Sequence, residues 1–247
     1  MARLDWMCRP IAHRGLHDKD RGIVENTPSA FEAAMDGGYG IECDLQCAGD
    51  GTAMVFHDDT LERLTDAGGK VAGRSTGELK KIRFRQTGDR MLILPELLEM
   101  VGGKVPLIIE IKTDWVNRGP FEARICSDLA GYKGQAALMS FDPYSVRACA
   151  EHGPKIPRGL VAEAFRDDHY WSGLTAWQRF QMRHLLSAFV ARPQFVAYDI
   201  NALPAAAPVL ARKLLGWPLL TWTVRTEAQR EIAERWTDAI IFEKLRP

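Results

Sequence analysis

The 247-residue chain has no excess of charge of either sign. Lys and Arg together number 32, as do Asp and Glu, so the formal net charge is zero. Domains that bind nucleic acid, or that are held on an anionic bilayer by bulk charge, are typically basic. We therefore expect no nucleic acid or membrane surface as a bulk partner. Any function that depends on charge must lie in a local cluster of side chains.

Cysteine pairs with the spacing of a metal or redox site are also absent. The chain has five cysteines, an odd number, and no C-x-x-C pair, which argues against a zinc site or a thiol redox centre. Cys43 stands in an alternating apolar stretch, where a buried, unreactive thiol is expected. This cysteine usage fits a reducing cytoplasm, so we expect a cytoplasmic protein.

Long apolar runs, internal repeats, low-complexity tracts and linkers are missing as well. No window of about 18 apolar residues occurs, so we expect no membrane span. The first ten residues contain no uninterrupted apolar run, so we expect no leader segment. The hydrophobic fraction of 46% is enough for a sizeable core. One (β/α)8 barrel typically needs about 250 residues, and we expect residues 1–247 to form a single domain.

Short apolar runs recur along the chain, with amphipathic stretches between most of them. The expected strands are Pro10–Arg14, Gly40–Gln46, Leu107–Lys112, Ala136–Phe141, Arg158–Val161, Phe195–Asp199, Leu219–Val224 and Ala239–Phe242. Thr27-Pro28 has the form of a helix start, and Thr226 precedes a similar segment, Glu227–Trp236. Eight strands alternating with helices predict a parallel sheet closed into a TIM-type (β/α)8 barrel. A doubly wound open sheet is the alternative, because periodicity does not show closure.

Two segments interrupt this rhythm. Residues 58–94 are polar and contain several glycines, which predicts a small inserted segment after the second barrel strand. Phe165–Val190 is rich in large side chains, namely Tyr170, Trp171, Trp177, Phe180 and Met182. Such a segment is either a barrel helix packed on its neighbours or a surface for lipid or a partner.

Carboxylates occupy one face of two expected strands. Gly40–Gln46 alternates strictly, and the outer face of a parallel barrel packs on helices, so Glu42 and Asp44 should point inward. Neighbouring buried carboxylates repel each other and lose hydration, so they need a cation or protons. The third expected strand repeats the pattern and sends Glu110 inward. Three such groups favour one hard divalent cation, Mg2+ or Ca2+, although Glu110 and Lys112 could instead neutralise each other.

Two histidines stand at strand ends, His13 before Arg14-Gly15 and His57 before Asp58. Beside an inward acidic cluster, such a pair predicts general acid and base catalysis. Arg14 and Lys112 add positive charge that suits the oxygens of a phosphate. We therefore expect a small-molecule phosphate ester as the partner.

A hairpin should bring His57 back to the carboxylates. Asp50-Gly51 predicts a two-residue turn, which places Asp44 opposite His57 and Gln46 opposite Val55. Directly paired residues share a face. A register shifted by one residue would turn His57 to the opposite face.

Five short motifs follow one another: His13-Arg14-Gly15, Glu25-Asn26-Thr27-Pro28, Glu42-Cys43-Asp44, His57-Asp58 and Ile109-Glu110-Ile111-Lys112. Their order and approximate spacing resemble those of the glycerophosphodiester phosphodiesterase family, in its bacterial, cytoplasmic type. Ser140-Phe141 and Trp222-Thr223-Val224 are similar to the family's later markers. The resemblance runs from about residue 10 to the end.

The resemblance implies metal-dependent hydrolysis of glycerophosphodiesters to glycerol 3-phosphate and an alcohol. It implies His13 and His57 as acid and base. It also implies three metal ligands (Glu42, Asp44 and Glu110) and three substrate-binding residues (Arg14, Lys112 and Trp222). Two further residues, Glu25 and Asn26, would support the first loop.

Two stretches depart from the family's pattern, Arg63-Leu64-Thr65 and Ile240-Ile241-Phe242-Glu243, since many members end the latter strand with Thr and Asp. One alternative is a lysophospholipase D-type or other phosphodiesterase on a bulkier substrate, which the aromatic segment would support if it is exposed near the barrel mouth. Another is a non-catalytic protein that binds a phosphate compound. Such a protein should have lost a histidine or a carboxylate, and none is lost.

Overall fold

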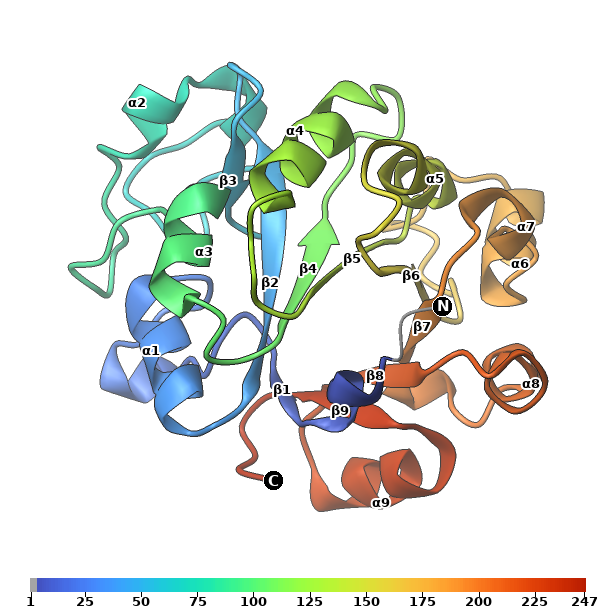
Figure 1. Ribbon diagram of the computed structural model, residues 1–247. Helices are drawn as coiled ribbons and strands as arrows, with labels where there is room; N and C mark the ends of the chain where they lie inside the picture. The colour runs from blue at the N-terminus through green and yellow to red at the C-terminus, as the bar shows by residue number, and fades with distance from the viewer. Residues whose placement is uncertain (1–3) are drawn as a thin grey trace.

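The computed structural model describes residues 4–247 and contains a closed ring of parallel strands surrounded by helices (Figure 1). In ring order the strands are β1 (Ile11–Ala12), β2 (Gly40–Cys47), β4 (Leu107–Ile111), β5 (Ala136–Ser140), β6 (Arg158–Ala162), β7 (Phe195–Asp199), β8 (Leu219–Val224) and β9 (Ala239–Phe242). Because β1 pairs with both β2 and β9, the ring closes. The predicted (β/α)8 barrel is confirmed and the open sheet is excluded. Residues 1–3 of the expected domain lie outside the described range.

Helices connect the strands on the outside of the ring. They are α1 (Pro28–Asp36), α2 (Thr76–Leu79), α3 (Leu94–Val101), α4 (Pro120–Leu129), α5 (Pro143–His152), α6 (Ala176–Arg183), α7 (Ala188–Ala191), α8 (Ala206–Leu210) and α9 (Glu227–Trp236). Thr226 caps α9 as predicted, because its side chain accepts a hydrogen bond from the Gln229 backbone N–H. Thr27 occupies the N-cap position of α1, but its hydroxyl donates to the Val24 carbonyl instead.

Two apolar layers fix which way the strand residues point. Ile41, Cys43 and Leu45 of β2 are buried in the large cluster that also contains residues of the surrounding helices. A separate cluster contains Ile108 of β4 and Phe195 of β7, two strands that β5 and β6 separate in the ring. Since side chains alternate along a strand, the polar residues between the outward apolar residues of β2 point into the barrel, as the sequence predicts.

The inserted segment has a core of its own. Residues between β3 (Ala53–Val55) and α3 enclose a small cluster that includes Phe56, Leu61 and Phe84. The hairpin turn holds this segment in place, because the carboxylate of Asp50 accepts hydrogen bonds from the backbone N–H and the hydroxyl of Thr76, both at 2.8 Å. The insertion therefore packs beside the barrel mouth, where β2 ends (Figure 1).

The hairpin between β2 and β3 does not have the predicted register. Gln46 pairs with Met54 and not with Val55. The turn contains three residues, because the Ala48 backbone N–H bonds to the Thr52 carbonyl at 2.9 Å. Gly51 takes the left-handed φ of 81° that the last residue of such a turn requires. The two-residue turn was therefore wrong, and the register is shifted by one residue.

This shift does not turn His57 away, because the strand ends before it. The last ladder bond joins the Phe56 N–H to the Asp44 carbonyl at 3.0 Å, and the Phe56 ring enters the core of the insertion. The chain then bends at His57. His57 reaches the barrel mouth by leaving the strand and not by pairing across it.

The remaining expectations concern thiols and hydropathy. All five cysteines are free. Cys43 is fully buried, and burial raises the pKa of its thiol, which fits an unreactive side chain. Within residues 4–247, no helix has the length and hydropathy needed to cross a membrane.

Packing inside the barrel yields a stability prediction. Gly159 of β6 lies directly beside Phe195 of β7, and a Cβ at Gly159 would lie 2.2 Å from that ring. We expect Gly159→Ala to lower the free energy of unfolding by about 1–3 kcal/mol, the usual effect of overpacking a core. Urea unfolding followed by circular dichroism measures this change.

Gly77→Ala is the matched control for this substitution. Gly77 lies in α2 with nothing within 4 Å of its added Cβ, so the same chemical change should leave stability unchanged or raise it slightly. Equal stability of the two variants would contradict the packing described for the barrel interior.

Candidate active site

Barrel closure places His13 between two carboxylates. In the parallel ladders Ala12 pairs with Ile41 on one side and with Phe242 on the other, so the next residue, His13, is flanked by Glu42 and Glu243. Nδ1 of His13 lies 2.5 Å from Oε1 of Glu243, and Nε2 lies 3.8 Å from Oε2 of Glu42. Burial lowers the pKa of His13, and the hydrogen bond with Glu243 opposes that effect.

Glu42, Asp44 and Glu110 form a buried cluster whose carboxylate oxygens lie within 4.8 Å of one another. The ladder between β2 and β4 sets this arrangement, because it pairs Asp44 with Glu110. Burial raises the pKa of Glu42 well above its usual range, and repulsion from Asp44 and Glu110 raises it further. The sequence prediction that these three side chains converge inside the barrel agrees with their positions.

Two basic side chains pack against this cluster. Nζ of Lys112 lies 2.5 Å from Oε1 of Glu110 and 2.9 Å from Oδ1 of Asp44. Nε of Arg14 lies 3.3 Å from Oδ2 of Asp44. Burial alone would raise the pKa of Asp44, but Lys112 and Arg14 hold it well below its usual range. Lys112 thus pairs with Glu110, as the alternative interpretation of the sequence proposed, but it does not satisfy the whole cluster.

The donor set fits a hard divalent cation. One oxygen of Glu42 accepts from the Arg14 backbone N–H at 2.9 Å, whereas the other, Oε1, is buried with no hydrogen-bond partner among the described residues. A buried carboxylate oxygen without a partner is costly. The cluster offers only carboxylate oxygens, the ligands that Mg2+ and Ca2+ prefer. A cation held by these three residues would satisfy the orphaned oxygen.

Glu25 and Asn26 connect the first loop to the cluster. The side-chain amide of Asn26 donates to Oδ2 of Asp44 at 2.8 Å and accepts from the Asp44 backbone N–H at 3.3 Å. Glu25 accepts from both Arg14 and Arg63 at 2.7 Å. Burial would raise the pKa of Glu25, but these two arginines lower it to about 2.

His57 is held by the residue that follows it. Nδ1 of His57 lies 2.7 Å from Oδ1 of Asp58, and Arg63 donates to the same carboxylate at 2.5 Å. Since Arg63 also contacts Glu25, the support of His57 is connected to that of Arg14. Arg63 therefore joins both loops of the site.

Most of the predicted site residues line one cavity of about 370 Å³ at the barrel mouth. They are His13, Arg14, Glu42, His57, Glu110, Lys112 and Trp222. Asp44, Glu25 and Asn26 lie behind this lining and contact it through the bonds described above. Trp222 of β8 packs edge-on against Phe141, with ring centroids 5.6 Å apart. The structure therefore brings the predicted residues together.

Reasoning from the sequence missed Glu243, Asp58 and Arg225. Glu243 follows the last strand, and Arg225 donates to it at 2.7 Å. Closure of the barrel was the signal available for Glu243, because it makes the last strand a neighbour of the first. Adjacency to His57 was the signal for Asp58.

The aromatic segment is only partly buried. Trp171 is 6% exposed and packs on Phe141, whereas Trp177 and Phe180 of α6 are 62% and 46% exposed. Tyr170 lines both the catalytic cavity and an adjoining groove of about 850 Å³. The segment therefore supplies one buried wall of the mouth and an exposed aromatic surface beside it.

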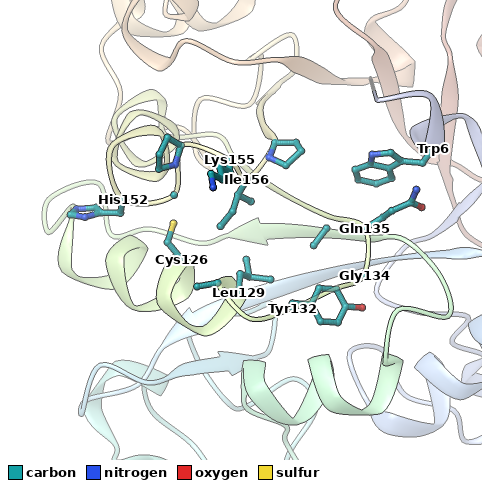
Figure 2. A pocket seen from close by; sticks show the side chains of 14 residues that line it. Trp6, Cys126, Leu129, Tyr132, Gly134, Gln135, His152, Lys155 and Ile156 are labelled. Carbon is teal, nitrogen blue, oxygen red and sulfur yellow. The ribbon is translucent and has the colours of Figure 1, made fainter. Parts of the chain in front are cut away.

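Another cavity, of about 580 Å³, lies at the other end of the barrel. It is lined by Trp6, Cys126, Ile156 and residues that precede β5 and β6 (Figure 2). None of the predicted site residues takes part. The chemistry of the barrel is therefore assigned to the mouth formed by the carboxyl ends of the strands.

Comparison with known proteins agrees with this geometry. The model of the glycerophosphoryl diester phosphodiesterase family matches residues 13–245. A glycerophosphodiester phosphodiesterase from Caldanaerobacter subterraneus subsp. tengcongensis is 31% identical, over 94% of this chain and 92% of its own length. Glycerophosphodiester phosphodiesterase 1 of Bos taurus is 38% identical, over 91% of this chain and 74% of its own.

Solved structures show the same fold. A phosphodiesterase from Oleispira antarctica, solved in complex with the product sn-glycerol-3-phosphate, superposes with a TM-score of 0.77 at 22% identity, covering 95% of this chain and 92% of that one. The family model spans residues 13–245, which include both histidines, and the relative at 31% identity covers 94% of the chain. The chain therefore belongs to the glycerophosphoryl diester phosphodiesterase family and is a phosphodiesterase.

Proposed function

We propose that this enzyme hydrolyses glycerophosphodiesters to glycerol 3-phosphate and an alcohol, with one divalent cation, Mg2+ or Ca2+, and paired histidine catalysis. Glu42, Asp44 and Glu110 would hold the cation, and Arg14 and Lys112 would contact the phosphate oxygens. The neighbouring Oleispira antarctica structure, solved with sn-glycerol-3-phosphate, supports this substrate class.

The matched orientation of the two histidines carries the proposal. Each ring has its Nδ1 against a carboxylate, Glu243 for His13 and Asp58 for His57. Burial would raise the pKa of both carboxyl groups, but their histidine partners and nearby arginines lower it, so both accept as anions. The Nδ1 atoms therefore carry protons, and each Nε2 is left for proton transfer at the cavity.

Proton transfer then follows from these positions. The unprotonated Nε2 of one histidine takes the proton of the nucleophile as the oxygen of the nucleophile forms a bond to phosphorus. The nucleophile is water, or the glycerol 2-hydroxyl of the substrate, which would give a cyclic phosphate that water opens to glycerol 3-phosphate in a second step. The bond from phosphorus to the leaving alcohol oxygen breaks, and the protonated Nε2 of the other histidine gives its proton to that oxygen. Arg14 and Lys112 orient the phosphate for this displacement. A divalent cation held by Glu42, Asp44 and Glu110 would supply Lewis acidity for this displacement.

A bulkier diester such as a lysophospholipid is the second candidate substrate. The groove of about 850 Å³ that adjoins the cavity is lined by Trp115, Val116 and Leu174 as well as by His57, so it offers an apolar path for a chain. Parallel turnover assays with deacylated and lysophospholipid diesters decide between the two substrates.

Loss of either histidine should stop the chemistry without unfolding the barrel. We expect His13→Ala and His57→Ala each to lower kcat by about 10²–10⁴-fold, the usual contribution of a general acid or base. His152→Ala, in the cavity at the other end of the barrel, is the matched control and should keep full activity. Near-full activity of both site variants would refute the assigned roles.

Glu42→Gln should weaken cation binding without lowering the thermal stability of the metal-free protein. The substitution removes one charge from the cluster, so cation affinity by titration calorimetry should fall about tenfold or more. Repulsion from Asp44 and Glu110 would also end, so the metal-free variant should melt at the same temperature as the native enzyme or higher. A metal-free variant that melts lower, with unchanged cation affinity, would contradict the proposed cluster.

Glu243 should act through His13 and not on substrate binding. Glu243→Gln removes the anion that fixes the His13 tautomer, and a comparable exchange in a serine protease lowers kcat about 10⁴-fold. We expect a fall in kcat of at least tenfold with KM nearly unchanged. Glu243→Asp keeps the charge and should recover part of kcat. A rise in KM alone would show that Glu243 contacts the substrate instead.

A further inference from the structure

The cavity has a second charged wall, opposite the proposed cation site. In the ring, β7 lies across the barrel from β2, and β6 lies across from β1. Asp199 ends β7 and Glu163 follows β6. Both line the same cavity as Glu42 and His13, together with Asp167 from the aromatic segment. The mouth therefore has carboxylates on the side away from the phosphate-binding cations.

Among residues 4–247, no ion pair is formed by Glu163, Asp167 or Asp199. The bonds they accept come from neutral donors: Trp171 Nε1 donates to Glu163 at 2.7 Å, and the Asn201 backbone N–H and side-chain amide each donate to Asp199 at 3.0 Å. Arg225 also lines the cavity, but its guanidinium group forms an ion pair with the carboxylate of Glu243.

The negative charges of Asp199 and Asp167 also repel that of Glu163. Burial raises the pKa of Glu163, and repulsion from Asp199 and Asp167 raises it further, against the effect of the Trp171 hydrogen bond. Like charges gathered at one wall of a cavity favour a cationic occupant.

Aromatic rings form the rest of this wall. Trp171, Trp222 and Phe141 line the cavity, and Phe141 packs against both tryptophans, with centroid distances of 5.2 Å and 5.6 Å. Tyr170 packs on Trp171 at 4.8 Å. Ring faces beside carboxylates form a favourable environment for an ammonium group, and for a quaternary ammonium in particular, because such a group cannot donate hydrogen bonds.

We propose that this wall binds the cationic end of the leaving alcohol, so that the preferred substrates are zwitterionic glycerophosphodiesters with a quaternary ammonium headgroup. The phosphate would lie toward Arg14 and Lys112, and the ammonium would lie between Trp171, Trp222 and the carboxylates of β6 and β7. This inference rests on the proposed hydrolysis and names the headgroup that the same site selects.

A pair of substrates that differ in charge alone tests the inference. One is glycerophosphocholine, and the other is its 3,3-dimethylbutyl analogue, in which carbon replaces the nitrogen at almost the same shape. We expect the native enzyme, with its metal, to have a kcat/KM roughly 5- to 30-fold higher for the charged diester, the range expected for a cation bound by aromatic rings. Equal values would overturn the inference while leaving the proposed hydrolysis intact. No turnover of either diester would instead refute the proposed function.

Conservative variants locate the preference on the wall. Glu163→Gln and Asp199→Asn keep the hydrogen-bond acceptors but remove the charges, so the ratio of the two kcat/KM values should fall about fivefold in the double variant. Asp168→Asn is the matched control, because Asp168 pairs with Arg179 outside the cavity lining. It should keep the native ratio. An unchanged ratio in a double variant that melts like the native enzyme would overturn the role of the carboxylates.

Discussion

Repulsion among the buried carboxylates of the barrel interior is the constraint on which the site depends. Glu42, Asp44 and Glu110 are at most 7% exposed, and isolated carboxylates are not stable in such a place. Lys112 and Arg14 offset part of the repulsion through direct contacts with Asp44 and Glu110. Repulsion still raises the pKa of Glu42, and one oxygen of this carboxylate has no hydrogen-bond partner among the described residues. The cluster is therefore not a closed network of ion pairs, and we propose that a cation completes it.

Closure of the barrel determines which side chains surround the carboxylate cluster. Because β1 lies between β2 and β9, His13 contacts the carboxylate cluster on one side and its positioning partner, Glu243, on the other. The same closure places the acidic and aromatic wall of β6, β7 and β8 across the cavity. Barrel closure thus places the proposed phosphate site and the proposed headgroup site on opposite sides of one cavity.

The sequence predicted the parts of the structure that depend on local periodicity. Strict alternation in β2 and β4 was sufficient to send Glu42, Asp44 and Glu110 inward, and the eight strand positions were correct. The hairpin register was wrong because the choice between a two- and a three-residue turn depends on backbone bonds that Asp50-Gly51 alone does not determine. Glu243 and the wall containing Glu163 and Asp199 were missed because they meet the site only through contacts between strands far apart in sequence.

A crystal structure of the enzyme soaked with Mn2+, recorded at a wavelength where manganese scatters anomalously, tests the central claim most directly. Mn2+ takes the same oxygen ligands as Mg2+ and reports its own position. The account predicts one strong anomalous peak within bonding distance of Glu42, Asp44 and Glu110, on the side of the cavity that faces His13 and His57. An enzyme that turns over glycerophosphodiesters, but shows no peak at these carboxylates or binds the ion elsewhere, would contradict it.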